Sequence, residues 1–155
     1  MEGHSFIFTP GVWLGEGKIL LSMLEEQLVF FTRWSIGAKD PKGHIECLQE
    51  IQVRGLSDVL VNHYTFFDMT PTTFHVLMDN YAVGKISGSG IIHPEMVGWE
   101  FRVKELGFEG FEFYEKQSDE LYHVQGEFAT SDDLRTKVQG RVWYQKDRTM
   151  GNFDE

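Results

Sequence analysis

Six histidines are the first residues of this sequence that could hold a metal ion or move a proton: His4, His44, His63, His75, His93 and His123. Ligand pairs on one strand or one helical turn would be two or four residues apart, and no pair has either spacing. A metal site would therefore need strand pairing to bring histidines together. His63 alternates with Val59 and Val61, so we expect it to face the interior as a polar anchor for a ligand.

Arg141 is the most informative charged residue, because two interpretations of its strand remain open. If Trp143 points inward, the two-residue period of a strand takes Arg141 and Gln139 inward as well. A buried guanidinium needs a carboxylate partner, so Arg141 would then anchor an acidic head group. The other register buries Val138 and Val142 and leaves Arg141 on the surface, and hydrophobicity slightly favours it. Both faces carry large residues, so the sequence does not decide between them.

Motifs of several catalytic classes are missing. The sequence has no G-x-S-x-G, no Walker loop and no C-x-x-C. It therefore lacks the motifs of serine hydrolases, P-loop nucleotide-binding proteins and dithiol redox proteins. Cys47 is the single cysteine and is expected to be a small core residue. It cannot form a disulfide within the chain, and no secretory signal precedes the first strand, so we expect a cytoplasmic protein.

The charge of −10, from 24 acidic and 14 basic residues, excludes some partners. Nucleic acid and anionic membranes need a basic surface, so neither is an expected partner. No apolar run approaches the roughly 20 residues of a membrane helix. The acidity itself is explained by solubility, and the sequence leaves a homodimer open.

The elements that must position these residues are strands. The chain is 14% aromatic, contains 16 glycines and four prolines, and shows turn signals every 8 to 12 residues or so. A lead-in over residues 1–10, with Phe6–Phe8 covering one end of a core, precedes about ten alternating segments. These are 11–24, 28–36, 44–53, 59–69, 72–79, 85–93, 96–105, 110–116, 121–130 and 134–145. Short connections and little helix predict an all-β, up-and-down antiparallel barrel as a single domain over residues 1–155.

The alternation also predicts an inner wall of large apolar side chains. With about ten strands, the interior is wider than that of an eight-stranded barrel, which side chains fill, so a ligand cavity is expected. We expect aromatic residues and a methionine to line an adaptable apolar pocket. The expected wall residues are Trp34, Phe74, Val76, Met78, Trp99, Phe101, Phe111 and Phe113.

Three short motifs give this pattern a family resemblance. Gly11-Val12-Trp13 is a G-x-W on a first strand, and with Leu14-Gly15-Glu16-Gly17 it resembles the opening G-x-W-x-G-x-G of nitrobindin-like proteins. His44-Ile45-Glu46 resembles their H-x-E segment. Arg141-Val142-Trp143 is similar to the R-x-Y of fatty-acid-binding proteins. The chain thus resembles the calycin superfamily, which includes the lipocalins.

The resemblance implies a ten-stranded barrel with an internal cavity. It also implies that Trp13 is a structural plug that closes one barrel end, under a basic residue of the last strand such as Arg135 or Arg141. Fatty-acid-binding proteins place two helices between their first two strands, where this chain has only residues 24–27. Nitrobindins bind haem through a histidine near the C-terminus, but no histidine follows His123, so the sequence disfavours haem as a cofactor.

The leading hypothesis is a barrel that binds a small, mostly apolar molecule, such as a lipid, a fatty-acid-like compound or a tetrapyrrole-like compound. Its polar anchors would come from Arg141, His63 and Gln139. One alternative is an enzyme of isomerase, cyclase or decarboxylase type, which would need an inward Glu, Tyr or His near Arg141. Another is an interaction module with a filled core. The sequence favours binding over catalysis.

Overall fold

A computed structural model describes residues 3–23, 26–132 and 134–146, and the remaining residues, including those predicted to end the first strand, lie outside this description. The described chain contains ten strands and one 3₁₀ turn, η1 (Lys104–Leu106). The strands are β1 (Gly11–Leu21), β2 (Gln27–Ile36), β3 (Ile45–Val53), β4 (Val59–Phe67), β5 (Thr73–Asn80), β6 (Gly84–His93), β7 (Met96–Val103), β8 (Phe108–Ser118), β9 (Leu121–Ala129) and β10 (Arg135–Tyr144).

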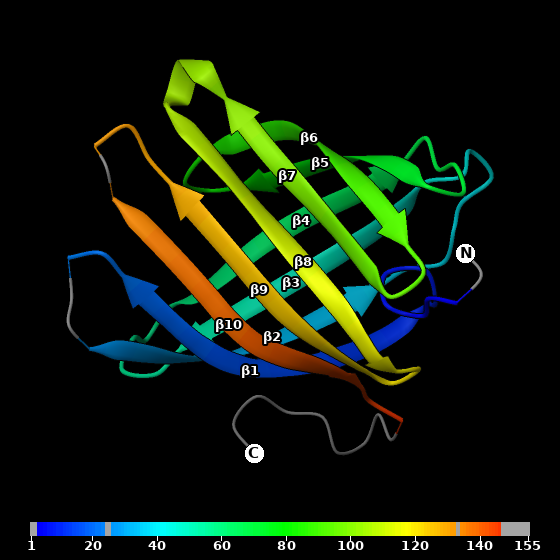
Figure 1. Ribbon diagram of the computed structural model, residues 1–155, viewed down its shortest axis with the longest axis horizontal. Helices are drawn as coiled ribbons and strands as arrows, with labels where there is room; N and C mark the ends of the chain where they lie inside the picture. The colour runs from blue at the N-terminus through cyan, green and yellow to red at the C-terminus, as the bar shows by residue number, and fades with distance from the viewer. Residues whose placement is uncertain (1–2, 24–25, 133, 147–155) are drawn as a thin grey trace.

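The strands close into a single antiparallel barrel in which each strand pairs with its neighbours in sequence and β10 returns to β1 (Figure 1). This confirms the predicted all-β up-and-down barrel. Closure matters because it leaves no unpaired sheet edge. We call the end where β1 finishes and β2 begins the mouth; it lies on the left of Figure 1.

Glycines in β1 and β6 make room for neighbouring chain. A Cβ on Gly17 would lie 2.1 Å from the carbonyl oxygen of Gln139, so β1 and β10 approach closely only because position 17 has no side chain. A Cβ on Gly90 would lie 2.1 Å from the ring of Phe74. The pairing of β6 with β5 is regular, and the glycines of β6 accommodate aromatic rings.

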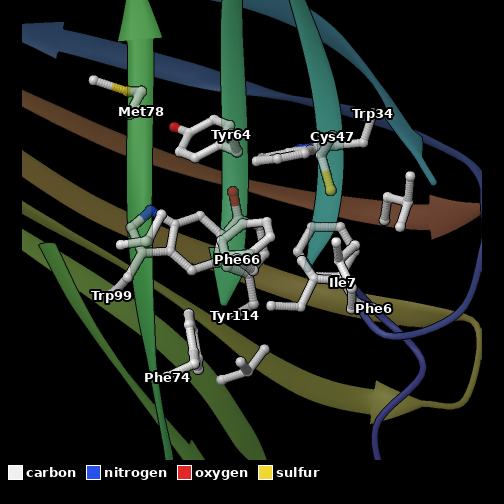
Figure 2. Close-up of a cluster of buried hydrophobic side chains, with 14 of the residues drawn as sticks. Phe6, Ile7, Trp34, Cys47, Tyr64, Phe66, Phe74, Met78, Trp99 and Tyr114 are labelled. Atoms are coloured by element: carbon white, nitrogen blue, oxygen red, sulfur yellow. The ribbon is translucent and has the colours of Figure 1, made fainter. Parts of the chain in front are cut away.

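The end opposite the mouth is closed by the N-terminal segment, residues 3–10, which crosses the right-hand end of the barrel in Figure 1. Phe6 and Ile7 are fully buried there. The Phe6 ring packs 4.6 Å from that of Tyr114 and 5.5 Å from that of Trp34, centroid to centroid (Figure 2). Trp13 lies beneath, 5.1 Å from Phe6. The prediction that Phe6–Phe8 cover one end of the core is therefore confirmed for Phe6 and Ile7.

No arginine of β10 covers Trp13, contrary to what the family resemblance implies. Arg141 lies 5.3 Å from the ring centroid of Trp143, and Arg135 pairs with Glu127 at 3.3 Å. Trp13 is instead surrounded by aromatic rings, because the N-terminal segment supplies the cover. Its burial at the closed end is what a plug requires, although the partner differs from the one expected.

Strand β8 faces the opposite way from the prediction. Phe111 and Phe113 point outward and are half-buried, whereas Glu112 and Tyr114 are buried inside. The register explains the reversal, because Glu112 pairs with inward-facing Trp99 and Phe113 pairs with Gly98. Gly98 has no side chain, so the Phe113 ring covers its outer face.

Two further inward assignments are wrong. On β10, Val142 is buried, whereas Arg141, Gln139 and Trp143 are on the outer face, as in the register that hydrophobicity favoured.

On β4, Tyr64 and Phe66 are buried, which turns the intervening strand positions outward and leaves His63 exposed. The apolar alternation of Val59 and Val61 misled the prediction, because these residues lie near the mouth and are themselves exposed.

Candidate functional site

A cavity of about 220 Å³ occupies the half of the barrel nearest the mouth. Apolar side chains form much of its wall, among them Ile19, Phe30, Val138 and Val142. Ile19 and Val138 face inward yet remain partly exposed, so water reaches the cavity from the mouth. The other half of the barrel is filled by fully buried rings such as Trp34 and Trp99.

A chain of hydrogen-bonded amides runs along one wall across β2, β3, β4 and β5; we call it the amide ladder. The Asn80 side-chain nitrogen donates to Asn62 at 3.0 Å, and the Asn62 nitrogen donates to Gln49 at 3.0 Å. Gln49 donates to the Thr32 hydroxyl at 3.3 Å, and Thr32 donates to the carbonyl oxygen of Glu50 at 2.9 Å.

The ladder is tied to the backbone at its other end too, since the Val83 amide donates to the Asn80 side chain at 2.9 Å. Buried amides are stable when their hydrogen bonds are satisfied, so this wall is polar yet fixed. Each carbonyl oxygen of the ladder still has a second lone pair for a ligand donor.

Glu112 lies on the opposite wall. Its strand β8 is five steps from β3 in either direction around the closed barrel, so it faces Gln49 across the interior. The side chain is 8% exposed, and a Cβ on Gly126 would lie 3.1 Å from its Cγ, so the absent side chain of Gly126 makes room for it. Among the described residues, its hydrogen-bond donor is the Tyr114 hydroxyl, at a long 3.4 Å.

Burial raises the pKa of the Glu112 carboxyl to about 7, because a charge is poorly solvated in the barrel, and the Tyr114 hydrogen bond lowers it only in part. Burial also raises the pKa values of Tyr64 and Tyr114 well above their usual range, and the nearby Glu112 charge adds to both shifts. The cavity therefore holds one acid that titrates near neutrality, beside two phenols that stay protonated. A carboxyl tuned in this way can bind a cationic group or transfer a proton.

Few residues of the predicted site line this cavity. Met78 does, whereas Trp34, Phe74, Trp99 and Phe101 are buried in the packed core and do not line it. Arg141 contributes to the wall, but its guanidinium lies outside the barrel, 2.8 Å from Glu16.

The sequence prediction missed Glu112, Tyr64, Tyr114 and the amide ladder. A usable signal was present for the ladder alone, because Gln49 falls in the apolar alternation of its strand. For β8, both faces carry aromatic residues, so the pattern did not single out Glu112.

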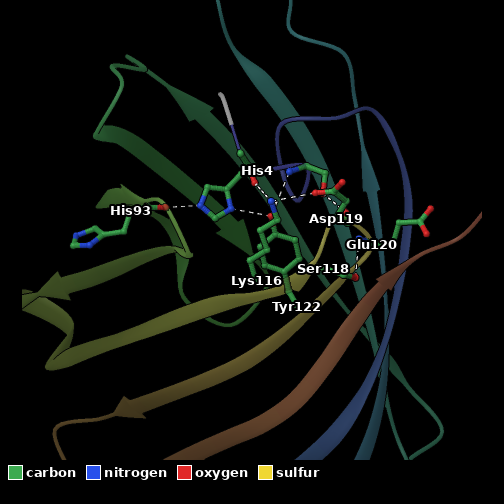
Figure 3. A network of polar contacts seen from close by, with 9 residues as sticks. His4, His93, Lys116, Ser118, Asp119, Glu120 and Tyr122 are labelled. Atoms are coloured by element: carbon green, nitrogen blue, oxygen red, sulfur yellow. Dashed lines mark hydrogen bonds and ion pairs between the residues drawn. The ribbon is translucent and has the colours of Figure 1, made fainter.

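A second polar cluster lies at the closed end, where it holds the N-terminal segment in place (Figure 3). The His4 ring bonds the Tyr122 hydroxyl at 2.8 Å and the backbone carbonyl of His93. Lys116 donates to the carbonyl oxygen of Gly3 and pairs with Asp119 at 3.1 Å. These polar groups bond to other groups of the protein, so we assign this cluster a structural role: it anchors the N-terminal segment.

Metal and thiol chemistry have little support in the described part of the chain. No group of three or more His, Cys, Asp or Glu residues there is arranged to hold a metal ion. Burial raises the pKa of the Cys47 thiol to about 12, so it stays protonated, as expected of a core cysteine. In the same described ranges, no helix is long and apolar enough for a membrane crossing.

Comparison with known proteins gives a structural relative of the barrel but no sequence relative. No family model matches the sequence, and a search of curated proteins gave no match. Among solved structures, the S-type phycobiliprotein lyase CPES from Guillardia theta is similar, with a TM-score of 0.67 over 90% of each chain and 9% sequence identity. At that identity the likeness shows the fold alone, so this chain shares the antiparallel barrel fold of that lyase, while the nitrobindin-like subtype has no support from the comparison.

Proposed function

We propose that this barrel binds a small, mostly apolar molecule in the cavity at its mouth. The observation that carries the proposal is the cavity itself, because a ten-stranded barrel could have been filled by its own side chains and is filled only in its closed half. Ligand pockets combine an apolar wall with a few fixed polar groups, and here the amide ladder and Glu112 are those groups.

The size of the cavity limits the ligand. A cavity of roughly 150 Å³ holds benzene, whereas pockets for drug-sized ligands begin at roughly 300 Å³. At about 220 Å³, the cavity suits a body of one or two rings or a short branched chain. A tetrapyrrole-like ligand, one of the classes that the sequence suggested, has four rings and would require the barrel to widen.

The charge of the wall limits the ligand as well. A fatty-acid-like ligand carries a carboxylate, which would need a cation beside it. Among the described residues, the basic residue of the wall is Arg141, and its guanidinium is engaged outside with Glu16. We therefore place neutral and cationic ligands ahead of anionic ones.

The enzymatic alternative now depends on different residues. It required an inward Arg141, but the Arg141 guanidinium is on the outer face. Glu112 and Tyr114 are therefore the pair that a proton-transfer reaction would use. Binding needs only the cavity, whereas catalysis needs a reacting group at Glu112, so binding is the simpler proposal.

The direct test pairs two tryptophan substitutions on β10. Val138 faces the cavity near the mouth, so Val138→Trp should fill it, while Lys137→Trp adds the same ring to the exposed outer face. Native mass spectrometry of the purified protein would show any carried ligand, and ligand-observed NMR would measure binding of neutral one- and two-ring compounds, indole among them. We expect Val138→Trp to weaken binding by at least about tenfold, since it occupies the ligand's volume, and Lys137→Trp to leave it unchanged.

Two outcomes would overturn this proposal. One is that no neutral, cationic or anionic compound of this size binds the unmodified protein. The other is that binding persists undiminished in Val138→Trp, which would place the site elsewhere on the molecule.

A further inference from the structure

The charged groups of the cavity are unbalanced. Glu112 is the one carboxylic acid of the described wall, and its titratable neighbours are the phenols of Tyr64 and Tyr114, which stay neutral. Arg141 does not compensate it, because its guanidinium pairs with Glu16 on the outer face. Once Glu112 is ionised, above its pKa of about 7, the interior therefore holds a negative charge without a positive partner from the described wall.

The Glu112 carboxyl is also short of hydrogen bonds. An ionised carboxylate can accept about four, and the described residues supply one long contact, from Tyr114. A buried charge in this state is unfavourable unless a partner arrives, and a ligand that donates hydrogen bonds from a cationic group would be such a partner.

The surroundings favour a cation at larger distances too. The net charge of −10 produces a negative potential around the molecule, which attracts cations and repels anions on their way to the mouth. The wall around Glu112 is otherwise largely apolar, so the body of the ligand must be apolar.

We propose that the cavity selects small amines, in which an apolar body of one or two rings carries one protonated nitrogen that pairs with the Glu112 carboxylate. This inference rests on the proposed function and names the ligand class for that same cavity. The amide ladder, which is fixed to the backbone at its ends and lies on the wall opposite Glu112, then packs against the ring of the ligand.

The inference predicts a pH dependence of ligand affinity that can be measured on the unmodified protein. An amine arrives protonated, and Glu112 must release its own proton for the ion pair to form. Affinity for an amine should therefore rise from pH 5 to about pH 7 and level off above, because burial raises the pKa of Glu112 to about 7. A neutral compound of the same shape should show no such dependence.

The test compares three compounds that share a ring: benzylamine, benzyl alcohol and benzoate. Isothermal titration calorimetry with the full chain at pH 8 should show benzylamine binding at least about tenfold more tightly than benzyl alcohol, as expected for a hydrogen bond to a charged group, with benzoate weakest. Glu112→Gln should remove the preference for the amine over the alcohol. Glu115→Gln, which replaces an exposed acid on the outer face of the same strand, makes the same charge change and should leave that preference as it is in the unmodified protein.

Each outcome separates the two proposals. If benzyl alcohol binds as tightly as benzylamine, or benzoate binds best, the amine inference is wrong and the binding barrel stands. If none of the three compounds binds, both fall. If Glu112→Gln does not fold by circular dichroism, the pH series on the unmodified protein decides, and an affinity for benzylamine that is flat between pH 5 and 8 overturns the inference.

Discussion

At the scale of single residues, Glu112 is where the stability of this protein and its proposed ligand binding meet. The barrel holds this acid in the half that contains the cavity, where the described residues give it one long hydrogen bond. Residues selected only for packing would place an apolar side chain there. A group that is unfavourable in the empty barrel and favourable with a partner is typical of functional sites.

The buried acid predicts a pH dependence of folding. In the unfolded chain Glu112 titrates near 4.5, and in the barrel at about 7, so between these values the folded state binds more protons. Its contribution to the free energy of unfolding should therefore fall as pH rises from 4.5 to 7, by about 3 kcal/mol at most, and stay constant above.

Urea unfolding of the unmodified protein and Glu112→Gln at pH 5 and pH 8 measures this effect. The variant should be the more stable of the two at pH 8, because it has no charge to bury, and Glu115→Gln should follow the unmodified protein. A Glu112→Gln difference that is the same at both pH values would show that the carboxyl titrates normally.

At the scale of elements, the sequence predicted the strands well and their faces unevenly. All ten strands lie where alternation and turn signals placed them, since hydrophobic period and glycine-rich turns are local properties. The predicted inward face of a strand is wrong where both of its sides carry large residues. On β8, Phe111 and Phe113 are the more hydrophobic side, but they lie outside because Trp99 and Gly98 of β7 fix the pairing. The cavity depends on those faces, so most of it could not be predicted.

The N-terminal segment is the element that closes the barrel, and a matched pair of substitutions tests it. Phe6→Ala should lower the free energy of unfolding by about 3–5 kcal/mol, because the ring is fully buried among Trp13, Trp34 and Tyr114. Phe113→Ala makes the same change on the outer face, where the ring is only half-buried, and should have the smaller effect. Equal losses would contradict the direction assigned to β8.

At the scale of the whole molecule, the barrel is divided into a packed end and an accessible end. The connections and strand ends near the mouth carry several exposed apolar side chains, including Met23, Leu56, Leu60, Tyr81 and Leu106. Such residues on an otherwise acidic protein can lead an apolar body toward the cavity, while the net charge of −10 attracts a cationic head.

This arrangement predicts a salt effect on association. Raising ionic strength screens the long-range potential, so the association rate of benzylamine should fall between 20 and 200 mM salt, whereas that of benzyl alcohol should not. Relaxation-based NMR measures both rates, and equal salt dependence for the two compounds would show that the charge of the molecule has no part in binding.

The account as a whole depends on an acid that is held inside the barrel and becomes charged when a cation arrives. The most direct measurement is the ¹³C NMR titration of the Glu112 carboxyl, assigned by its absence in Glu112→Gln, with and without benzylamine. The account predicts a midpoint near pH 7 in the free protein and a lower midpoint at saturating benzylamine. A midpoint near 4.5 that benzylamine does not move would contradict it.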